Sequence, residues 1–201
     1  MIRSFFLKNF RYIVFIALVS CVGTVKNSAD TCQIFEDNYF WYKAVKSSEK
    51  KWGAPVELQM AFIQRESDFD FRATPGWDKL FKIIPYKRKS SSYGYSQAVD
   101  KTWEQYQNET GNKYALRISF YDSIDFIGWY INKTNKLLRI PKNDYFRQYI
   151  AYHEGWGQYK NYTKSPDAIK FAKAVDRVAK KYKYQLDQCK HKLSTDKYII
   201  F

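Results

Sequence analysis

The sequence predicts a mainly α-helical fold made of a single domain. Over most of the 201 residues, apolar side chains recur at spacings of three and four, the period of a helix with one buried face. Glycine and proline stand at the ends of several of these runs, where helices stop and start. No alternating apolar and polar run extends beyond a few residues, so we expect no substantial sheet.

The first twenty residues have the pattern of an export signal, which would be removed from the mature protein. Three basic residues precede the apolar stretch 12–19, which is shorter than the roughly 20 residues that span a membrane. The stretch ends at Leu18-Val19-Ser20-Cys21, which resembles a bacterial lipoprotein cleavage site with Cys21 as the acylated first residue. An ordinary secretory signal, or a short anchor that contains a cysteine, is the alternative. Val22 follows in place of aspartate, which resembles an outer-membrane address in Gram-negative lipoproteins.

This interpretation divides the chain into a signal peptide (1–20), a lipid-anchored tether (21–34) and a folded domain (35–201). Removal of the signal would leave 181 residues, enough for one hydrophobic core. Cys32 and Cys189 then remain as an even pair in an oxidising compartment, so we expect a disulfide between them, with two free thiols as the alternative. The expected location is the bacterial cell envelope, at the periplasmic side of the outer membrane.

Six helices are expected from their apolar period and their end signals. Gly53 ends the first helix, and Pro55 suits the first turn of the second. Asp100 is a candidate N-cap of the third helix, and Gly111 stops it. Ser165-Pro166-Asp167 gives the last helix an N-cap, a first-turn proline and an acidic residue at its positive end. The expected helices span residues 38–52, 55–69, 100–110, 122–136, 144–153 and 166–186.

Residues 70–92 have neither a helical nor a strand period. Pro75, Gly76 and Pro85, with a run of basic and serine residues, predict a long loop there. A loop of this length in a compact domain is uncommon unless it has a function.

The strongly positive charge indicates an anionic partner. The formal net charge is +14, and it falls by three to +11 without the basic residues of the signal. Cell-wall peptide stems with free carboxylates, anionic lipid headgroups and nucleic acid would all suit such a field, although solubility explains a single lysine equally well. An exported, lipid-anchored chain seldom meets nucleic acid, so we expect no nucleic-acid partner.

Glu66, near the end of the second expected helix, is a candidate general acid. A glycosidase must protonate a poor leaving group at neutral pH, so its acid needs a raised pKa. The negative end of the helix disfavours the carboxylate by roughly 0.3 to 1 kcal/mol, and nearby phenylalanines could cover it. On its own, a Glu-Ser pair is more often a solvated part of a helix.

Two further patterns downstream fit the same active site. In order, the three patterns are Glu66-Ser67, Gly94-Tyr95-Ser96-Gln97-Ala98 and Ala151-Tyr152-His153-Glu154-Gly155. Together they resemble the motifs of lytic transglycosylases of the soluble type (the SLT domain), in a lipoprotein branch related to goose-type lysozyme. The resemblance covers most of residues 35–180 and implies a lysozyme-like single helical domain. The departures, which concern subsite detail, are Tyr95-Ser96 in place of a leucine-like residue and methionine, and His153-Glu154 in place of Asn and a small residue.

The resemblance also implies a reaction on peptidoglycan glycan strands. Glu66, as the only acid and base, would protonate the β-1,4 oxygen between N-acetylmuramic acid (MurNAc) and N-acetylglucosamine (GlcNAc). It would then remove the proton of the muramyl C6 hydroxyl, which leaves a 1,6-anhydro-MurNAc end. Motif residues would line the substrate, and the two tyrosines beside the glycine turn are expected to face the cleft. The expected substrate-binding residues are Ser67, Tyr93, Tyr95, Gln97 and Tyr152.

Two other functions remain open. A hydrolytic lysozyme of the same fold would use a second carboxylate about 5 to 9.5 Å from the first, a role open to Asp68, Asp70, Asp100 or Glu154. A lipoprotein that binds cell wall without catalysis is the other alternative.

We expect neither a metal nor an organic cofactor. His153-Glu154 begins like the helix of a zinc protease, but Gly157 stands where its second histidine is needed. The expected protein is a monomer that reaches the membrane through its N-terminal lipid anchor.

Overall fold

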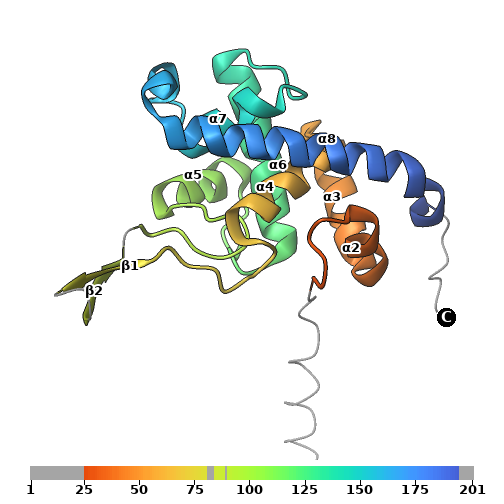
Figure 1. Ribbon diagram of the computed structural model, residues 1–201, viewed down its shortest axis with the longest axis horizontal. Helices are drawn as coiled ribbons and strands as arrows, with labels where there is room; N and C mark the ends of the chain where they lie inside the picture. The colour runs from red at the N-terminus through yellow and green to blue at the C-terminus, as the bar shows by residue number, and fades with distance from the viewer. Residues whose placement is uncertain (1–24, 81–83, 89, 195–201) are drawn as a thin grey trace, which may run out of the picture.

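Helix α6 (Phe120–Leu138) runs through the centre of the molecule, and the other helices pack around it (Figure 1). Ten of its nineteen residues are buried, as expected of a helix that is enclosed by neighbours. Helices α3, α4, α5 and α7 all contact it. The mainly α-helical single domain that the sequence predicts is confirmed.

The structure is a computed structural model, and it describes residues 25–80, 84–88 and 90–194. All six expected helices are present, and the largest difference is at the end of the last one. Within the described ranges no helix is both long and apolar enough to cross a bilayer. The expected signal peptide and Cys21 lie outside the described residues. The other elements are α2 (Thr31–Asp37), α3 (Tyr39–Trp52), α4 (Val56–Ser67), β1 (Trp77–Leu80), β2 (Ile84–Arg88), α5 (Asp100–Thr110), α7 (Tyr145–Glu154), the 3-10 helix η1 (Tyr159–Lys164) and α8 (Pro166–Ser194).

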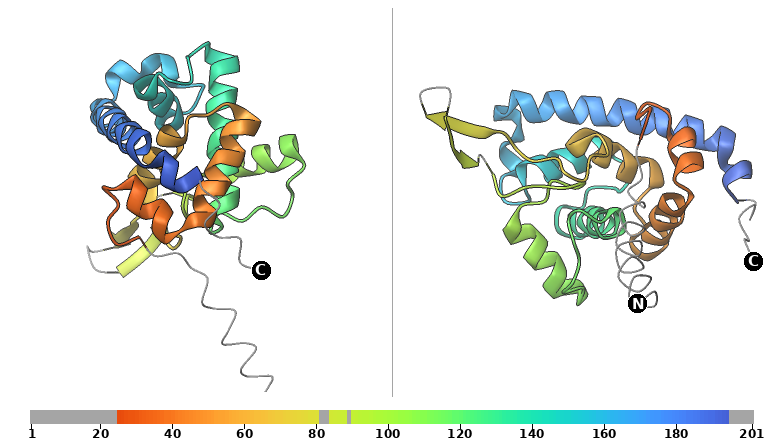
Figure 2. Two further views of the ribbon diagram at one scale, coloured as in Figure 1. Left: turned by 90° about the vertical axis from the view of Figure 1, so that its right-hand side faces the viewer. Right: turned by 90° about the horizontal axis from the view of Figure 1, so that it is seen from below.

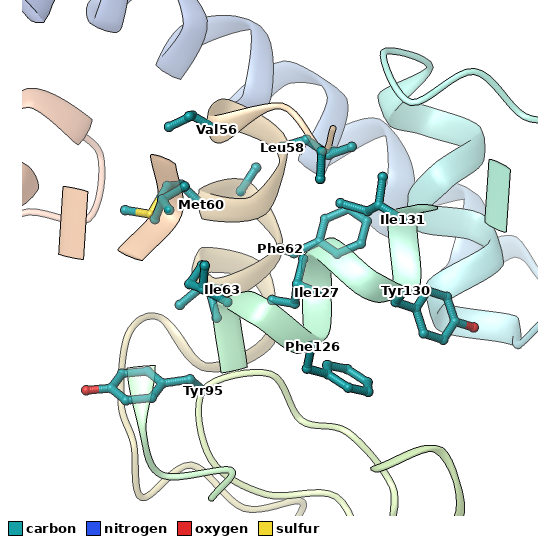
Figure 3. Packing of buried hydrophobic residues seen from close by; sticks show 14 of the residues in the cluster. Val56, Leu58, Met60, Phe62, Ile63, Tyr95, Phe126, Ile127, Tyr130 and Ile131 are labelled. Atoms are coloured by element: carbon teal, nitrogen blue, oxygen red, sulfur yellow. The ribbon is translucent and has the colours of Figure 1, made fainter. Parts of the chain in front are cut away.

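Helix α4 carries Glu66 and is anchored by its apolar face. Pro55 is the N-cap of this helix, one position before the first turn in which the sequence placed it. Phe62 is fully buried and faces Ile127 and Ile131 of α6 (Figure 3). The same helix packs extensively against α8. Burial on both sides holds the last turn of α4 in one position.

The chain leaves α4 through two left-handed residues. Asp68 has a φ of 48° and Phe69 a φ of 65°, a conformation that costs roughly 1 to 2 kcal/mol per non-glycine residue. Phe69 is nevertheless 4% exposed and stacks on Trp41 of α3 at 6.1 Å between ring centroids. This burial offsets the strain and fixes the turn directly after Glu66.

Helix α8 lies across the upper side in Figure 1 and is joined to α2 by a disulfide between Cys189 and Cys32. The disulfide predicted from the cysteine count is therefore confirmed. Gln185 of α8 adds two hydrogen bonds, accepting from the Thr31 N–H at 3.0 Å and donating to the Ala29 carbonyl at 3.1 Å.

The folded region begins earlier than the expected boundary at residue 35. Thr31 and Ile34 are buried in α2, inside the stretch 21–34 that was assigned to the lipid-anchored tether. Asp30 caps this helix by accepting from the Cys32 and Gln33 N–H groups. The small and polar residues of the tether gave no helical period, whereas the disulfide and the cap stabilise a helix of only two turns.

A two-stranded antiparallel hairpin projects from the helical body (Figure 2). Trp77 pairs with Arg88 and Leu80 with Ile84. The prediction of a structureless loop over 70–92 was wrong for this part. Pro85 and the lack of alternation concealed the strands, but a two-stranded ribbon has only edge strands, and edge strands tolerate proline.

Gly94, which begins the second motif, should not tolerate a side chain. Its φ is +77°, and a Cβ would lie 2.2 Å from the carbonyl oxygen of Arg117. We expect Gly94→Ala to lower the free energy of unfolding by about 3 to 5 kcal/mol, from left-handed strain plus the backbone clash. Urea denaturation would measure the loss. Gly111→Ala is the control, because Gly111 has a φ of +74° with nothing within 4 Å of the added Cβ, so only the strain of about 1 to 2 kcal/mol applies. Equal losses in the two variants would contradict the clash with Arg117.

Candidate active site

A cavity of about 460 Å³ brings together residues of all three sequence patterns. Its wall comes from the end of α4, the segment between β2 and α5, the first turn of α5, helix α6 and the end of α7. Polar groups alternate with aromatic rings, a composition suited to a carbohydrate. The lining residues are Glu66, Ser90, Ser92, Gln97, Ala98, Val99, Thr102, Phe126, Tyr130, Tyr152, His153, Glu154 and Gly155.

Glu66 has a covered carboxyl at this cavity. The residue is only partly exposed, and its Oε1 accepts a hydrogen bond from the Tyr149 hydroxyl at 2.7 Å. Burial raises the pKa of the Glu66 carboxyl above its ordinary value. The Tyr149 hydrogen bond and the charges of His153 and Arg65 act in the opposite direction without cancelling the rise. Glu66 therefore keeps its proton to a higher pH than a glutamate in water.

Two tyrosines one turn apart on α7 supply this cover. The rings of Tyr149 and Tyr152 lie against Phe62, with centroid distances of 5.2 and 4.8 Å. The Tyr152 hydroxyl donates to the Ser96 carbonyl and so ties the third motif to the second. Burial raises the pKa of both phenols, so both stay protonated donors.

Tyr149 is a partner of Glu66 that the three sequence patterns do not include. It lies three residues before Tyr152, in the predicted helix but outside the third pattern. The spacing of three was the available signal, because residues at this spacing share a helix face.

Gln97 lines the cavity, but its amide also holds the surrounding loops. Its Nε2 donates to the carbonyls of Ala73 at 2.8 Å and Gly94 at 2.9 Å, and its Oε1 accepts from the Ser92 hydroxyl at 3.3 Å. Its backbone is left-handed, with a φ of 49°. These three bonds offset the backbone strain, and strain of this kind is common at functional sites.

Three of the expected substrate-binding residues do not line the cavity, as far as the described residues show. Tyr95 is 3% exposed and packs edge-on against Trp41 and Phe120, so its expected position in the cleft was wrong. Figure 3 shows its ring directed away from Phe126 and Tyr130, which belong to the cavity wall. Tyr95 is therefore a core residue.

Tyr93 and Ser67 have local structural partners instead. The Arg117 guanidinium lies over the Tyr93 ring at 4.2 Å, and the half-buried ring is absent from the described cavity wall. The Ser67 hydroxyl donates to the Ile63 carbonyl one turn back, at 3.2 Å. Each residue is the chain neighbour of a cavity residue, Tyr93 of Ser92 and Ser67 of Glu66.

Of the four candidate second carboxylates, only Glu154 is part of the cavity wall. Its Oε1 lies 2.9 Å from His153 Nδ1 and accepts from the Ser165 hydroxyl at 3.0 Å. Asp100 is paired with Arg117 and Asp70 with Arg72, while Asp68 is the exposed C-cap of α4.

The expected capping role of Asp100 was also wrong, because Val99 is the N-cap of α5.

Within the ranges that the structure describes, no group of three or more His, Cys, Asp or Glu side chains is arranged to hold a metal ion. His153, the residue that begins the zinc-like pattern, contacts Glu154 and packs against Phe171 and Tyr149.

The chain matches the family described as the transglycosylase SLT domain over residues 9–189, which is most of its length. No curated protein matches the chain. The match extends over Glu66, the segment around Gln97 and the segment around Tyr152, whose side chains meet at the cavity. The chain therefore belongs to the transglycosylase SLT domain family and is a lytic transglycosylase that acts on peptidoglycan.

Proposed function

We propose that Glu66 alone carries the acid and base steps of this reaction. The enzyme cleaves the β-1,4 bond between MurNAc and GlcNAc and leaves a 1,6-anhydro-MurNAc end. The observation that supports this proposal best is the covered carboxyl of Glu66, whose pKa is raised by burial at the wall of a cavity.

The acid step needs a protonated carboxyl next to the glycosidic oxygen. Glu66 gives its proton to the oxygen that leaves with GlcNAc, and the muramyl N-acetyl group assists as the C1–O4 bond breaks. A pKa raised by burial lets Glu66 keep its proton to a higher pH than an ordinary glutamate, and general acid catalysis contributes about 10²- to 10⁴-fold.

The base step uses the same carboxyl after it has lost its proton. Glu66 accepts the proton of the muramyl C6 hydroxyl, and O6 forms the new bond to C1. No water is consumed, and Glu66 returns to its protonated form. The hydrogen bond from Tyr149 and the charges of His153 and Arg65 favour the carboxylate, so the group can act in both directions.

Glu154 is a poor candidate for a second catalytic carboxylate. Its Oε1 contacts both His153 and Ser165, so the carboxylate is oriented by groups at the edge of the cavity. We assign Gln97 and Tyr152, which line the same cavity, to binding the glycan strand.

The mass of the product tests the proposal. Purified sacculi digested with the protein should yield muropeptides with a 1,6-anhydro end, which are lighter by one water than those with a reducing end. Reducing ends as the main product would contradict the proposal and favour a hydrolytic lysozyme. Binding to sacculi without release of fragments would favour a cell-wall-binding lipoprotein instead.

Tyr149→Phe should shift the pH dependence of activity. In the wild type the hydrogen bond from Tyr149 favours the Glu66 carboxylate. Its loss in the variant therefore raises the Glu66 pKa further. We expect the high-pH limb of kcat/KM to move to higher pH and the maximum to fall about tenfold, because a hydrogen bond to a charged group contributes roughly 1.5 to 3 kcal/mol. Tyr145→Phe is the control, since Tyr145 lies on the same helix and donates to Glu57. An unchanged limb in Tyr149→Phe would contradict the role of Tyr149.

We also propose that the mature protein is a monomer anchored through acylated Cys21 at the periplasmic side of the outer membrane. The proposal rests on the basic start of the chain, the short apolar stretch and Leu18-Val19-Ser20-Cys21. Mass spectrometry of the purified N-terminal peptide would detect the acyl chains. An unmodified Cys21, or a retained signal, would contradict the anchor.

A further inference from the structure

Four exposed apolar residues form a ridge just before and at the start of α6. Their exposed fractions are 92% for Tyr114, 56% for Leu116, 47% for Ile118 and 50% for Tyr121. We call these four residues the apolar ridge. Single exposed apolar residues are ordinary on a protein surface, whereas four within eight positions of one segment indicate a surface that contacts something apolar.

The segment that carries the ridge is held firmly in place. Arg117, which is 9% exposed, donates from Nη1 to the carbonyls of Ser91 at 3.0 Å and Ala98 at 2.7 Å. The Leu116 N–H donates to Asp122 Oδ2 at 3.0 Å, and the Ser123 hydroxyl donates to the Arg117 carbonyl at 3.0 Å. These hydrogen bonds fix the backbone of the segment, so the side chains of the apolar ridge stay exposed to solvent.

The inward residues alternate with the ridge residues. Ala115 is 5% exposed, and Arg117 points toward the segment before α5, so the side chains on either side of them face outward. The segment turns at residues 113–114 and again at 117–118, and it carries its four exposed apolar side chains within eight positions. Rotating the ridge inward would expose the buried guanidinium bonds, so the outward orientation is the stable one.

The described chain starts on the same side of the molecule. In Figure 1 the red start of the chain lies on the lower side, where α6 also begins. Cys21 lies four positions before Val25, the first described residue, which is a span of at most roughly 14 Å. An acyl chain on Cys21 would hold this side of the domain close to a bilayer surface.

We propose that the apolar ridge rests in the interface of the bilayer that receives the acyl chains of Cys21. Tyrosine and aliphatic side chains suit the boundary between headgroups and hydrocarbon, and a second contact strengthens a lipid anchor. The inference depends on the proposed anchor and not on the cleavage chemistry of Glu66.

Docking of the ridge would orient the cavity relative to the membrane. Arg117 bonds the carbonyl of Ala98, and Ala98 lines the cavity, so the ridge and the cavity share one rigid connection. The cleft would then be presented to glycan strands at a fixed height and angle above the lipid surface.

Spin labelling of the acylated protein tests the proposal in vesicles of phosphatidylethanolamine and phosphatidylglycerol. A nitroxide at Ile118→Cys would report on the ridge, because Cys32 and Cys189 are joined and Cys21 is acylated. A nitroxide at Leu137→Cys is the control. Leu137 is 55% exposed and lies about 24 Å along α6 from Tyr121, the last residue of the apolar ridge. Membrane-soluble oxygen and a water-soluble nickel chelate would measure how deep each label lies.

We expect vesicle binding to raise the oxygen-to-nickel accessibility ratio several-fold at residue 118 and to leave residue 137 unchanged. Changing Tyr114, Leu116 and Tyr121 to serine should abolish this rise, while the protein still floats with the vesicles through its acyl chains. A label at residue 118 that stays as accessible to nickel as the label at residue 137 would overturn the proposal. Protection of residue 118 from both reagents without vesicles would also overturn it, because a protein surface would then cover the ridge. Failure of the anchor itself is a separate result, visible as loss of flotation with an unmodified Cys21.

Discussion

Glu66→Gln should abolish turnover and preserve the fold. Glutamine keeps the shape of the side chain and can still accept the hydrogen bond from Tyr149, but it has no proton to give and no charge to act as a base. Loss of general acid catalysis alone predicts a fall of about 10²- to 10⁴-fold, and loss of the base step adds to it. Release of soluble muropeptides from sacculi, with circular dichroism as the check on folding, would measure the effect.

Glu154→Gln is the matched control for this variant. Glu154 lines the same cavity, but its carboxylate is held by His153 and Ser165, so we expect turnover to fall by less than about tenfold. Turnover that survives in Glu66→Gln, or a loss in Glu154→Gln as large as in Glu66→Gln, would contradict the single-carboxyl mechanism.

The same pair of proteins gives a stability test with a defined sign. A carboxyl whose pKa is raised by folding binds its proton more tightly in the native state, so the wild type loses stability as pH rises through the folded pKa of Glu66. Glu66→Gln avoids this loss. The variant should therefore be more stable than the wild type above that pKa, and the difference should vanish below about pH 4, under the unfolded value. A difference that grows toward low pH would show that the pKa shift has the opposite sign.

Removing the disulfide should cause a large loss of stability. Cys32 and Cys189 are 157 residues apart, and closing a loop of this length restricts the unfolded chain by about 5 kcal/mol in the chain-entropy model. Measured losses are commonly about 2 to 5 kcal/mol, so Cys32→Ser with Cys189→Ser should lower Tm by roughly 4 to 20 °C. Calorimetry with and without reductant would measure the change.

The effect should be one of stability and not of catalysis. The disulfide lies between α2 and α8, whereas the cavity is formed by α4, α5, α6, α7 and the segment before α5. Specific activity below the transition should therefore match that of the wild type. Gln185→Ala is the control for local contact, because it removes two hydrogen bonds between α8 and the start of α2 but leaves the loop closed. A loss from Gln185→Ala equal to that from the double cysteine change would contradict the loop-closure explanation.

The helices could be predicted because their signals are local. Gly53 and Gly111 adopt left-handed φ values at helix ends, and Asp144 accepts from the Arg147 N–H as an N-cap. Helix α2 escaped prediction because it depends on a contact distant in the sequence, the disulfide between Cys32 and Cys189. The hairpin escaped it for a local reason, because Pro85 and the lack of alternation concealed the pairing of β1 with β2.

The cavity residues that could be predicted are those whose side-chain type is tied to the chemistry of the reaction. Glu66, Gln97 and Tyr152 stand at one cavity wall, as the three patterns suggested, although their roles remain a proposal. The position of Tyr95 could not be read from the sequence, because a tyrosine beside a glycine turn suits the core and the cleft equally well. Tyr149 shows the reverse case, in which an ordinary helix residue gains importance only from the packing of α7 against α4.

The covalent link between the two ends of the domain has a mechanical consequence. A pull on the N-terminus reaches Cys32 and is shared at once between α2 and the far end of α8. Unfolding from the N-terminus under force would stop at α2, where Cys32 is joined to Cys189. The helices around Glu66 lie within this closed loop, so the force would bypass them. If the proposed anchor holds the N-terminus, the enzyme keeps the geometry of its cleft while it is pulled.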